Sequence, residues 1–152
     1  MGLTYGFRSV RELFVKLQRD AKLLDEEVTS DRLFNFVLTG YSLIDWIKND
    51  PSVSQSAKSQ TEISSLYADP WLKICGDLAT ASKHFKLTNR QPVTRSATSC
   101  QGYGVGRYGK GGFGVGEEAI QIELDDGATY DGLEFVNGVV ETWKRFFHRH
   151  QI

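Results

Sequence analysis

The feature that most limits what this chain can fold into is the recurrence of apolar residues at steps of three and four along four long segments. Residues spaced in this way share one face of an α-helix, and that face must be buried against another element. Four amphipathic helices that bury their faces together form a helical bundle. The segments cover approximately residues 8–28, 30–49, 70–87 and 131–149.

Capping residues mark the ends of these segments. Ser9 and Glu12 fit a capping box, and Asp131 has the same relation to Glu134 at the start of the last segment. The residues 69–71, Asp-Pro-Trp, provide a cap followed by proline at the first helical position. The local signals therefore support the helices that the periodicity predicts.

The late part of the chain interrupts the helices. We expect residues 88–116 to form an irregular, glycine-rich loop, because glycine is a poor helix former. Alternating apolar residues and an Asp-Asp-Gly turn predict a small β-hairpin at about 118–130. The predicted fold is mainly α: a four-helix bundle in a single domain, residues 1–152, with the loop and the hairpin before the last helix.

Composition limits the class of protein. The 152 residues carry a net charge of −1, which gives no sign of a broad basic surface for nucleic acid. Neither a signal peptide nor an apolar run long enough for a membrane span is apparent, so we expect a cytoplasmic protein with no membrane contact. Cys75 and Cys100 belong to no Cys/His cluster at metal-ligand spacing, and we predict neither a metal nor a cofactor.

The glycine-rich segment contains letters that match a nucleotide-binding motif. Residues 104–109 read GxGxxG, but a dinucleotide site needs a strand before this motif and a helix after it. We favour a mobile connector, in which Arg107 and Lys110 supply contacts to an RNA or protein partner. Nucleotide binding through the loop is the second alternative that we keep for the function of the chain.

The third long helix carries the best candidate for chemistry. Asp77 and His84 are separated by about two turns and by about 20° of azimuth, so they share one stripe. This stripe lies well away from the apolar face, where we expect solvent or a substrate to reach it. His84 is a candidate acid or base, with Asp77 and Lys83 in support. Asp45 and Lys86 are candidate binding residues, and Asp45 can orient His84 if their helices pack together. The alternative is a histidine that is solvated or bonded across a helix interface.

Two segments carry a family resemblance. Residues 41–50, YSLIDWIKND, and 75–85, CGDLATASKHF, resemble segments of a family of small, uncharacterised bacterial and phage proteins with a HEPN-like helical bundle. The Trp-containing last helix, Val139 to Phe147, is also similar to theirs.

The resemblance implies a four-helix bundle, often a homodimer, in a family in which many members are metal-independent ribonucleases of toxin–antitoxin and phage-defence systems. Active members carry an arginine four to six residues before a histidine. The corresponding positions before His84 are Asp77, Leu78 and Ala79, and none is basic. Arg145 and His150 have the right spacing, but they lie at the chain end, where we expect fraying.

Two hypotheses about function follow. The first is a non-enzymatic helical binding or assembly module, for which the resemblance implies a homodimer and a relation to prophage or defence biology. The second is a HEPN-like, metal-independent ribonuclease that uses His84.

Overall fold

The computed structural model describes residues 2–102 and 117–152 of the chain, and the core of the predicted glycine-rich loop, 103–116, lies outside these residues. Within them the fold contains five helices and one three-stranded antiparallel sheet. In chain order the elements are α1 (Val10–Glu26), α2 (Ser30–Asn49), α3 (Gln60–Ala68), α4 (Pro70–His84), β1 (Thr94–Gly102), β2 (Glu117–Leu124), β3 (Thr129–Asp131) and α5 (Gly132–His150).

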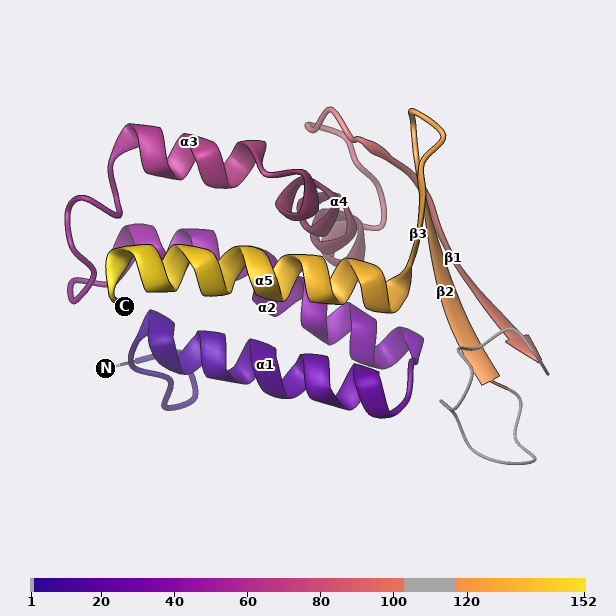
Figure 1. Cartoon of the computed structure of the whole chain (residues 1–152), viewed down its shortest axis with the longest axis horizontal. Helices are drawn as coiled ribbons and strands as arrows, with labels where there is room; N and C mark the ends of the chain where they lie inside the picture. Colours follow the sequence, from indigo (N-terminus) through magenta and orange to yellow (C-terminus); the bar gives the residue numbers. More distant parts are fainter. Residues whose placement is uncertain (1, 103–116) are drawn as a thin grey trace.

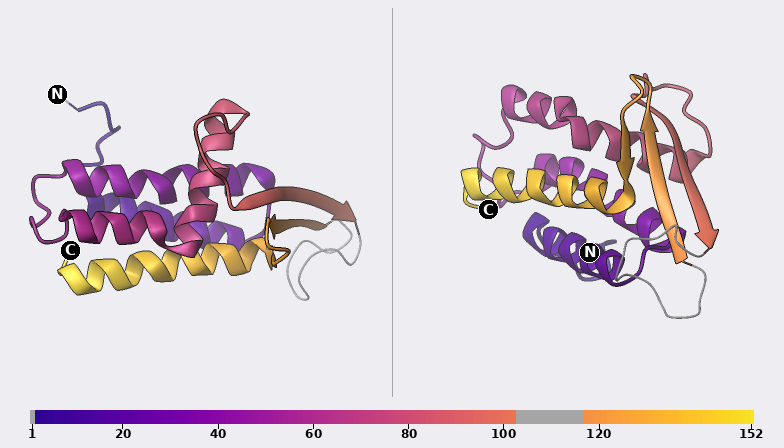
Figure 2. Two further views of the ribbon diagram at one scale, coloured as in Figure 1. Left: turned by 90° about the horizontal axis from the view of Figure 1, so that it is seen from above. Right: turned by 45° about the vertical axis from the view of Figure 1, so that its right-hand side comes forward.

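The helices do not all run in one direction. Helices α1, α2 and α5 lie side by side along the long axis of the molecule, whereas α4 is seen almost end-on in Figure 1 and crosses them steeply in Figure 2. Helix α4 packs on both α2 and α5. The mainly helical fold is therefore confirmed, but the arrangement does not confirm a four-helix bundle.

The core is centred on Gly40 in the middle of α2. A Cβ atom at this position would lie 3.2 Å from the Cys75 sulfur of α4 and 3.4 Å from a methyl group of Val139 in α5. The indole nitrogen of Trp143, which is completely buried, donates a 3.0 Å hydrogen bond to the Gly40 carbonyl oxygen. The absence of a side chain at Gly40 lets three helices approach one another closely.

The strand β1 corrects the prediction that residues 88–116 are irregular. It pairs antiparallel with β2, with Ala97 opposite Ile122, and the register shifts between Thr94 and Ser96. The β2–β3 hairpin, in contrast, agrees with the hairpin predicted at about 118–130. The strand order β1-β2-β3 leaves β1 at one edge of the sheet.

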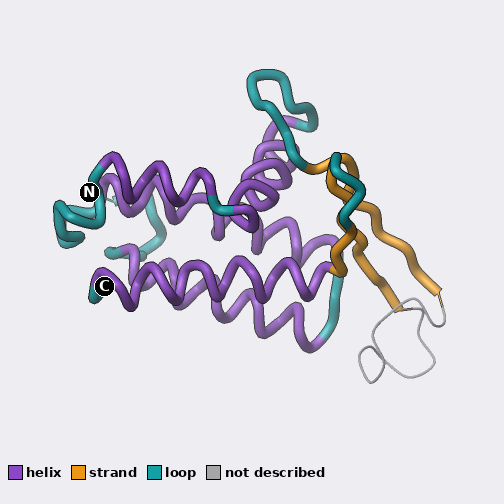
Figure 3. Tube along the Cα trace, turned by 45° about the horizontal axis from the view of Figure 1, so that its top comes forward, coloured by secondary structure: helices purple, strands orange, loops and turns teal. Residues whose placement is uncertain are grey.

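The β1–β2 ribbon extends past the ends of α1, α2 and α5 (Figures 1 and 3). Ile120 and Ile122 of β2 are buried, whereas Ala97 to Cys100 of β1 are exposed. The two ends of the chain lie at the opposite end of the molecule from the sheet (Figure 1). Among the described residues, no helix combines the length and the apolar character needed to cross a bilayer.

The Asp50 carboxylate ties the start of α1 to the end of α2. It accepts hydrogen bonds of 2.8 Å from the Val10 amide and 2.8 Å from the Ser52 amide, and one of 2.6 Å from the Ser52 hydroxyl. Burial alone would raise the pKa of Asp50, but the hydrogen bonds from Ser52 and Val10 outweigh burial and hold the pKa below its ordinary value of 3.8.

We predict that Asp50→Asn lowers the free energy of unfolding by about 1–2 kcal/mol at neutral pH. A carboxyl whose pKa is lowered by folding stabilises the fold above its unfolded pKa, and this stabilisation is lost as the pH falls through the lower, folded value. The variant should therefore lose less stability than the wild type between about pH 5 and pH 2. Urea unfolding across this range measures the difference, with the exposed Asp45→Asn as the control; identical acid profiles would contradict the prediction.

Candidate functional site

The helix α4 is fixed at its start by Asp69 and at its end by an unusual residue. The Asp69 carboxylate accepts hydrogen bonds from the amides of Trp71 and Leu72, at 2.9 and 3.1 Å, and Pro70 occupies the first turn. The helix ends at His84, because the next residue, Phe85, has a φ of 66°. The predicted end at about residue 87 is thus three residues too late.

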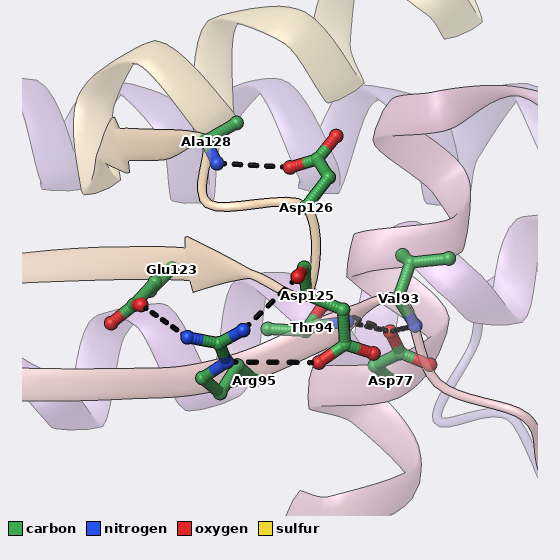
Figure 4. A network of polar contacts seen from close by, with 8 residues as sticks. All are labelled: Asp77, Val93, Thr94, Arg95, Glu123, Asp125, Asp126 and Ala128. Carbon is green, nitrogen blue, oxygen red and sulfur yellow. Dashed lines mark hydrogen bonds and ion pairs between the residues drawn. The ribbon is translucent and has the colours of Figure 1, made fainter.

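Asp77 is buried rather than solvent-accessible as the stripe predicted, with only 2% of its surface exposed. Its carboxylate accepts four hydrogen bonds: from Arg90 Nε at 2.6 Å, from the amides of Val93 and Thr94 at 3.0 Å each, and from the Thr94 hydroxyl at 2.8 Å. Figure 4 shows the contacts to Val93 and Thr94. One side chain of α4 therefore holds the segment that leads into β1.

Arg90 extends this network to α2. Its guanidinium donates to the Tyr41 hydroxyl at 3.0 Å and to the Lys73 carbonyl oxygen at 3.1 Å. Partial burial alone would lower the pKa of Arg90, but its bonds to Asp77 and Tyr41 raise it, so the group stays charged. Gly76 makes the contact possible, because a Cβ there would lie 2.4 Å from the guanidinium and 2.6 Å from the Tyr41 ring.

The apolar periodicity of residues 70–87 includes Phe85 and predicts that its ring lies on the core face. The residue is instead 89% exposed. A positive φ in an aromatic residue costs about 1 kcal/mol or more. Neither burial nor a favourable backbone conformation explains a phenylalanine at this position.

A groove of about 740 Å³ lies between the first half of α2, the second half of α4, and β1. Apolar side chains line its helical walls. Phe85 and Phe34 belong to the lining although both are exposed, Phe34 to 49%. The apolar residues from the helices and β2 are Leu33, Phe34, Val37, Leu78, Ala81, Phe85 and Ile120. Six consecutive residues of β1, Thr94 to Ser99, complete the lining.

The Glu118 carboxylate of β2 joins two walls of this groove. One of its oxygens accepts hydrogen bonds from the Ser30 amide at 2.9 Å and from the hydroxyl of Ser30, at the start of α2. The same oxygen accepts a 2.6 Å hydrogen bond from the Ser99 hydroxyl of β1. A carboxylate at a helix N-terminus is favourable for the helix dipole, so this bond also stabilises α2.

Lys83, His84 and Asp77 all line the groove, and within the described residues no hydrogen bond or ion pair joins them to one another. His84 is exposed, and no hydrogen bond or ion pair within residues 2–100 and 118–152 fixes its ring. Lys86 is exposed just beyond the end of α4. The catalytic roles predicted for Asp77, Lys83 and His84 stay predictions.

Asp45, another predicted binding residue, does not line the groove. Asp45 is exposed near the end of α2, where its carboxylate forms a 3.4 Å ion pair with the Lys48 ammonium group. Although α2 and α4 pack together, Asp45 is not part of the groove lining that includes His84. Arg107 and Lys110, and with them the hypothesis of nucleotide binding, lie outside the described residues.

Two further side chains of reactive types, the Cys75 thiol and the His150 imidazole, are held in packed surroundings. Burial raises the pKa of the Cys75 thiol, so it is a core side chain rather than a nucleophile. The α5 helix continues to His150, whose ring packs on Phe146 and lies 3.4 Å from a Glu62 oxygen. In the described part of the chain, no group of three or more His, Cys, Asp or Glu residues has metal-binding geometry.

Sequence reasoning missed three groups that shape the groove: Arg90, Glu118 and Phe34. The apolar pattern of residues 30–49 includes Phe34, and only its exposure distinguishes it from the core residues of α2. Arg90 and Glu118 act across long sequence separations, so no local pattern points to their partners. Together these residues give the open apolar groove a fixed frame.

Comparison with protein-family models finds no match, and comparisons with curated proteins and with solved structures find no significant similarity.

We predict that Asp77→Ala lowers the free energy of unfolding by about 2–4 kcal/mol, somewhat below the range for fully buried pairs because Arg90 is partly exposed. The amides of Val93 and Thr94 should exchange faster with solvent, since they lose their acceptor. Urea unfolding and hydrogen exchange measure the two effects, with Asp45→Asn as the exposed control. Unchanged stability and unchanged exchange would show that Asp77 does not anchor this segment.

Proposed function

We propose that this chain is a binding module without catalytic activity of its own, and that it binds a segment of a partner protein in the groove between α2, α4 and β1. The conformation of Phe85 is the observation that carries this proposal. A strained backbone that presents a large apolar ring to solvent costs stability twice, and such features concentrate at binding sites.

The groove has the size and composition of a ligand site. Its volume of about 740 Å³ lies within the range of pockets that bind organic ligands, and its helical walls are mainly apolar. Exposed aromatic residues such as Phe34 and Phe85 are the side chains that supply most of the binding energy at protein interfaces. The bonds of Asp77 and Glu118 hold the walls in place before a partner arrives.

The family resemblance adds finer elements to this proposal. It supports a relation to bacterial and phage proteins with a HEPN-like helical bundle and assembly as a homodimer. The sequence pattern, in which neither a signal peptide nor a membrane span is apparent, favours a cytoplasmic location. The side-by-side arrangement of α1, α2 and α5 is compatible with such a relation.

The test is a selection from random linear and cyclic peptides displayed on phage, followed by affinity measurement. We expect selected peptides to bind the wild type and to lose about tenfold or more in affinity for Phe85→Gly, which removes the ring. The same variant should unfold with a free energy about 1 kcal/mol higher, because glycine adopts a positive φ without strain. Calorimetry and urea unfolding measure the two changes.

A second pair of variants locates the site. Ala81→Trp fills the groove and should abolish binding, whereas Ala68→Trp places the same side chain on an exposed position of α3, outside the groove lining, and should leave binding intact. The proposal fails if no peptide is selected, or if the selected peptides bind Ala81→Trp as tightly as the wild type.

Metal-independent cleavage of RNA by His84 is the second candidate function. The observation that favours it is that His84, Lys83 and Ser82 line the same groove, so a bound RNA strand would meet a histidine and a cation. The binding-module proposal predicts no cleavage of single-stranded RNA in the presence of EDTA. Cleavage that His84→Ala eliminates, while circular dichroism shows an intact fold, would establish the ribonuclease instead.

A further inference from the structure

The strand β1 has one edge that no other described strand covers. The sheet order is β1-β2-β3, so β2 occupies one side of β1 and the opposite side has no neighbouring strand. An edge of this kind presents a row of backbone donors and acceptors, to which another extended chain can bind. Natural edges are commonly protected by proline or by charged residues, but residues 96–99 contain only serine, alanine and threonine.

The groove runs along this free edge. Six consecutive residues, Thr94 to Ser99, line it. Side chains of neighbouring residues in a strand point to opposite faces of the sheet, so a groove on one face would be lined by alternate residues only. Because consecutive residues line the groove, it reaches the edge of β1 as well as the sheet face on which Ile120 lies. At about 3.3 Å per residue, six residues provide an edge about 20 Å long.

The wall facing this edge is apolar and comes from the helices. Leu33, Phe34 and Val37 belong to α2, and Leu78 and Ala81 belong to α4. A strand added to β1 would direct every second side chain toward one face of the sheet. An occupant with apolar residues at alternate positions therefore matches both the backbone edge and the helical wall.

The charge at the α4 end of the groove is positive. Lys83 and Lys86 are exposed, and neither ammonium group forms an ion pair within residues 2–100 and 118–152. Arg95, which also lines the groove, is neutralised by Glu123 at 3.0 Å and by Asp125 at 4.0 Å, as Figure 4 shows. Among the described residues, the uncompensated charge therefore lies on Lys83 and Lys86, at and just beyond the end of α4, and it favours an acidic group on the occupant.

We propose that an extended segment of a partner protein adds to the free edge of β1 as a fourth strand, with alternating apolar side chains against α2 and α4 and an acidic residue beside Lys83 and Lys86. This inference rests on the proposed function and specifies its partner and its mode of binding. Backbone hydrogen bonds to β1 supply affinity, and the alternate side chains supply specificity.

A second copy of this chain is a poorer occupant than such a segment. If two β1 strands paired edge to edge, each would offer the other's groove the small side chains of Ser96, Ala97, Thr98 and Ser99. These side chains would leave much of the apolar wall in contact with water. The wall calls for larger apolar residues, which the described part of β1 does not contain.

The probe is a synthetic peptide in which valine alternates with threonine after two N-terminal glutamates. Its control has the same composition with the valines grouped together. We expect the alternating peptide to bind about tenfold or more tightly than the control and to protect alternate amides of residues 95–99 from hydrogen exchange. Equal binding of the two peptides, or no binding of either, would overturn the inference.

N-methylation separates strand addition from simple burial in a groove. The methyl groups are placed on alternate peptide nitrogens in two copies of the probe, so that one copy loses the donors facing β1 and the other loses the donors facing away. Strand addition predicts that one copy binds like the parent and that the other loses about tenfold or more. Equal affinities of the two copies would overturn strand addition.

The charge of the occupant is tested by reversal. The double variant Lys83→Glu with Lys86→Glu should weaken the acidic probe about tenfold and should prefer a probe with two lysines in place of the glutamates. The matched control is Lys22→Glu on the exposed face of α1, outside the groove lining. An unchanged preference would refute the acidic partner.

Two outcomes distinguish this inference from the proposed function. If peptides selected from the phage library bind in the groove but leave the β1 amides unprotected, the module stands and strand addition is wrong. If the chain alone sediments as a dimer with protected β1 amides, a second copy is the occupant and the inference is overturned. If no peptide is selected, the proposed function fails as well.

Discussion

The carboxylate of Asp77 is the interaction on which the position of the sheet depends. Within residues 2–102 and 117–152, it is the only side chain of α4 that forms hydrogen bonds to the backbone at the start of β1, at Val93 and Thr94. Arg90 neutralises its charge and connects it to Tyr41 of α2, so three separate parts of the chain meet at one buried group. A buried carboxylate without these partners would be strongly unfavourable, so the fold and this network require each other.

The positions of most helices can be predicted from the sequence because the signals that start and end a helix are local. The predicted start of α4 at residue 70 and the end of α2 at Asn49 are where the structure has them, since Asp69-Pro70 and Asp50-Pro51 act within a few residues. The direction in which α4 crosses the other helices, in contrast, has no local sequence signal. It depends on close approach at Gly40 and on the space at Gly76, and neither glycine differs from any other in a one-dimensional pattern.

The site was less predictable than the helices. The strand β1 contains few apolar residues and no apolar alternation, so it takes the form of a strand because β2 pairs with it and Asp77 anchors it. Asp77 itself was interpreted as part of a solvent-exposed stripe, because the sequence gives no sign that an arginine 13 residues later covers it. The sequence singled out Lys83 and His84 as catalytic candidates, a role that stays a prediction, whereas no local pattern indicated the apolar wall and the free edge beside them.

The bond that Glu118 makes to both Ser30 and Ser99 has a consequence for how selective the groove can be. A cleft whose sides move independently widens to accept whatever enters, and it spends part of the binding energy on that adjustment. Here one carboxylate oxygen holds the first turn of α2 and the ribbon at a set separation. The fixed spacing between α2 and β1 therefore selects the side chains of a ligand by size. Side chains that fit enter without any rearrangement of the groove, whereas bulkier ones must first break a charged hydrogen bond.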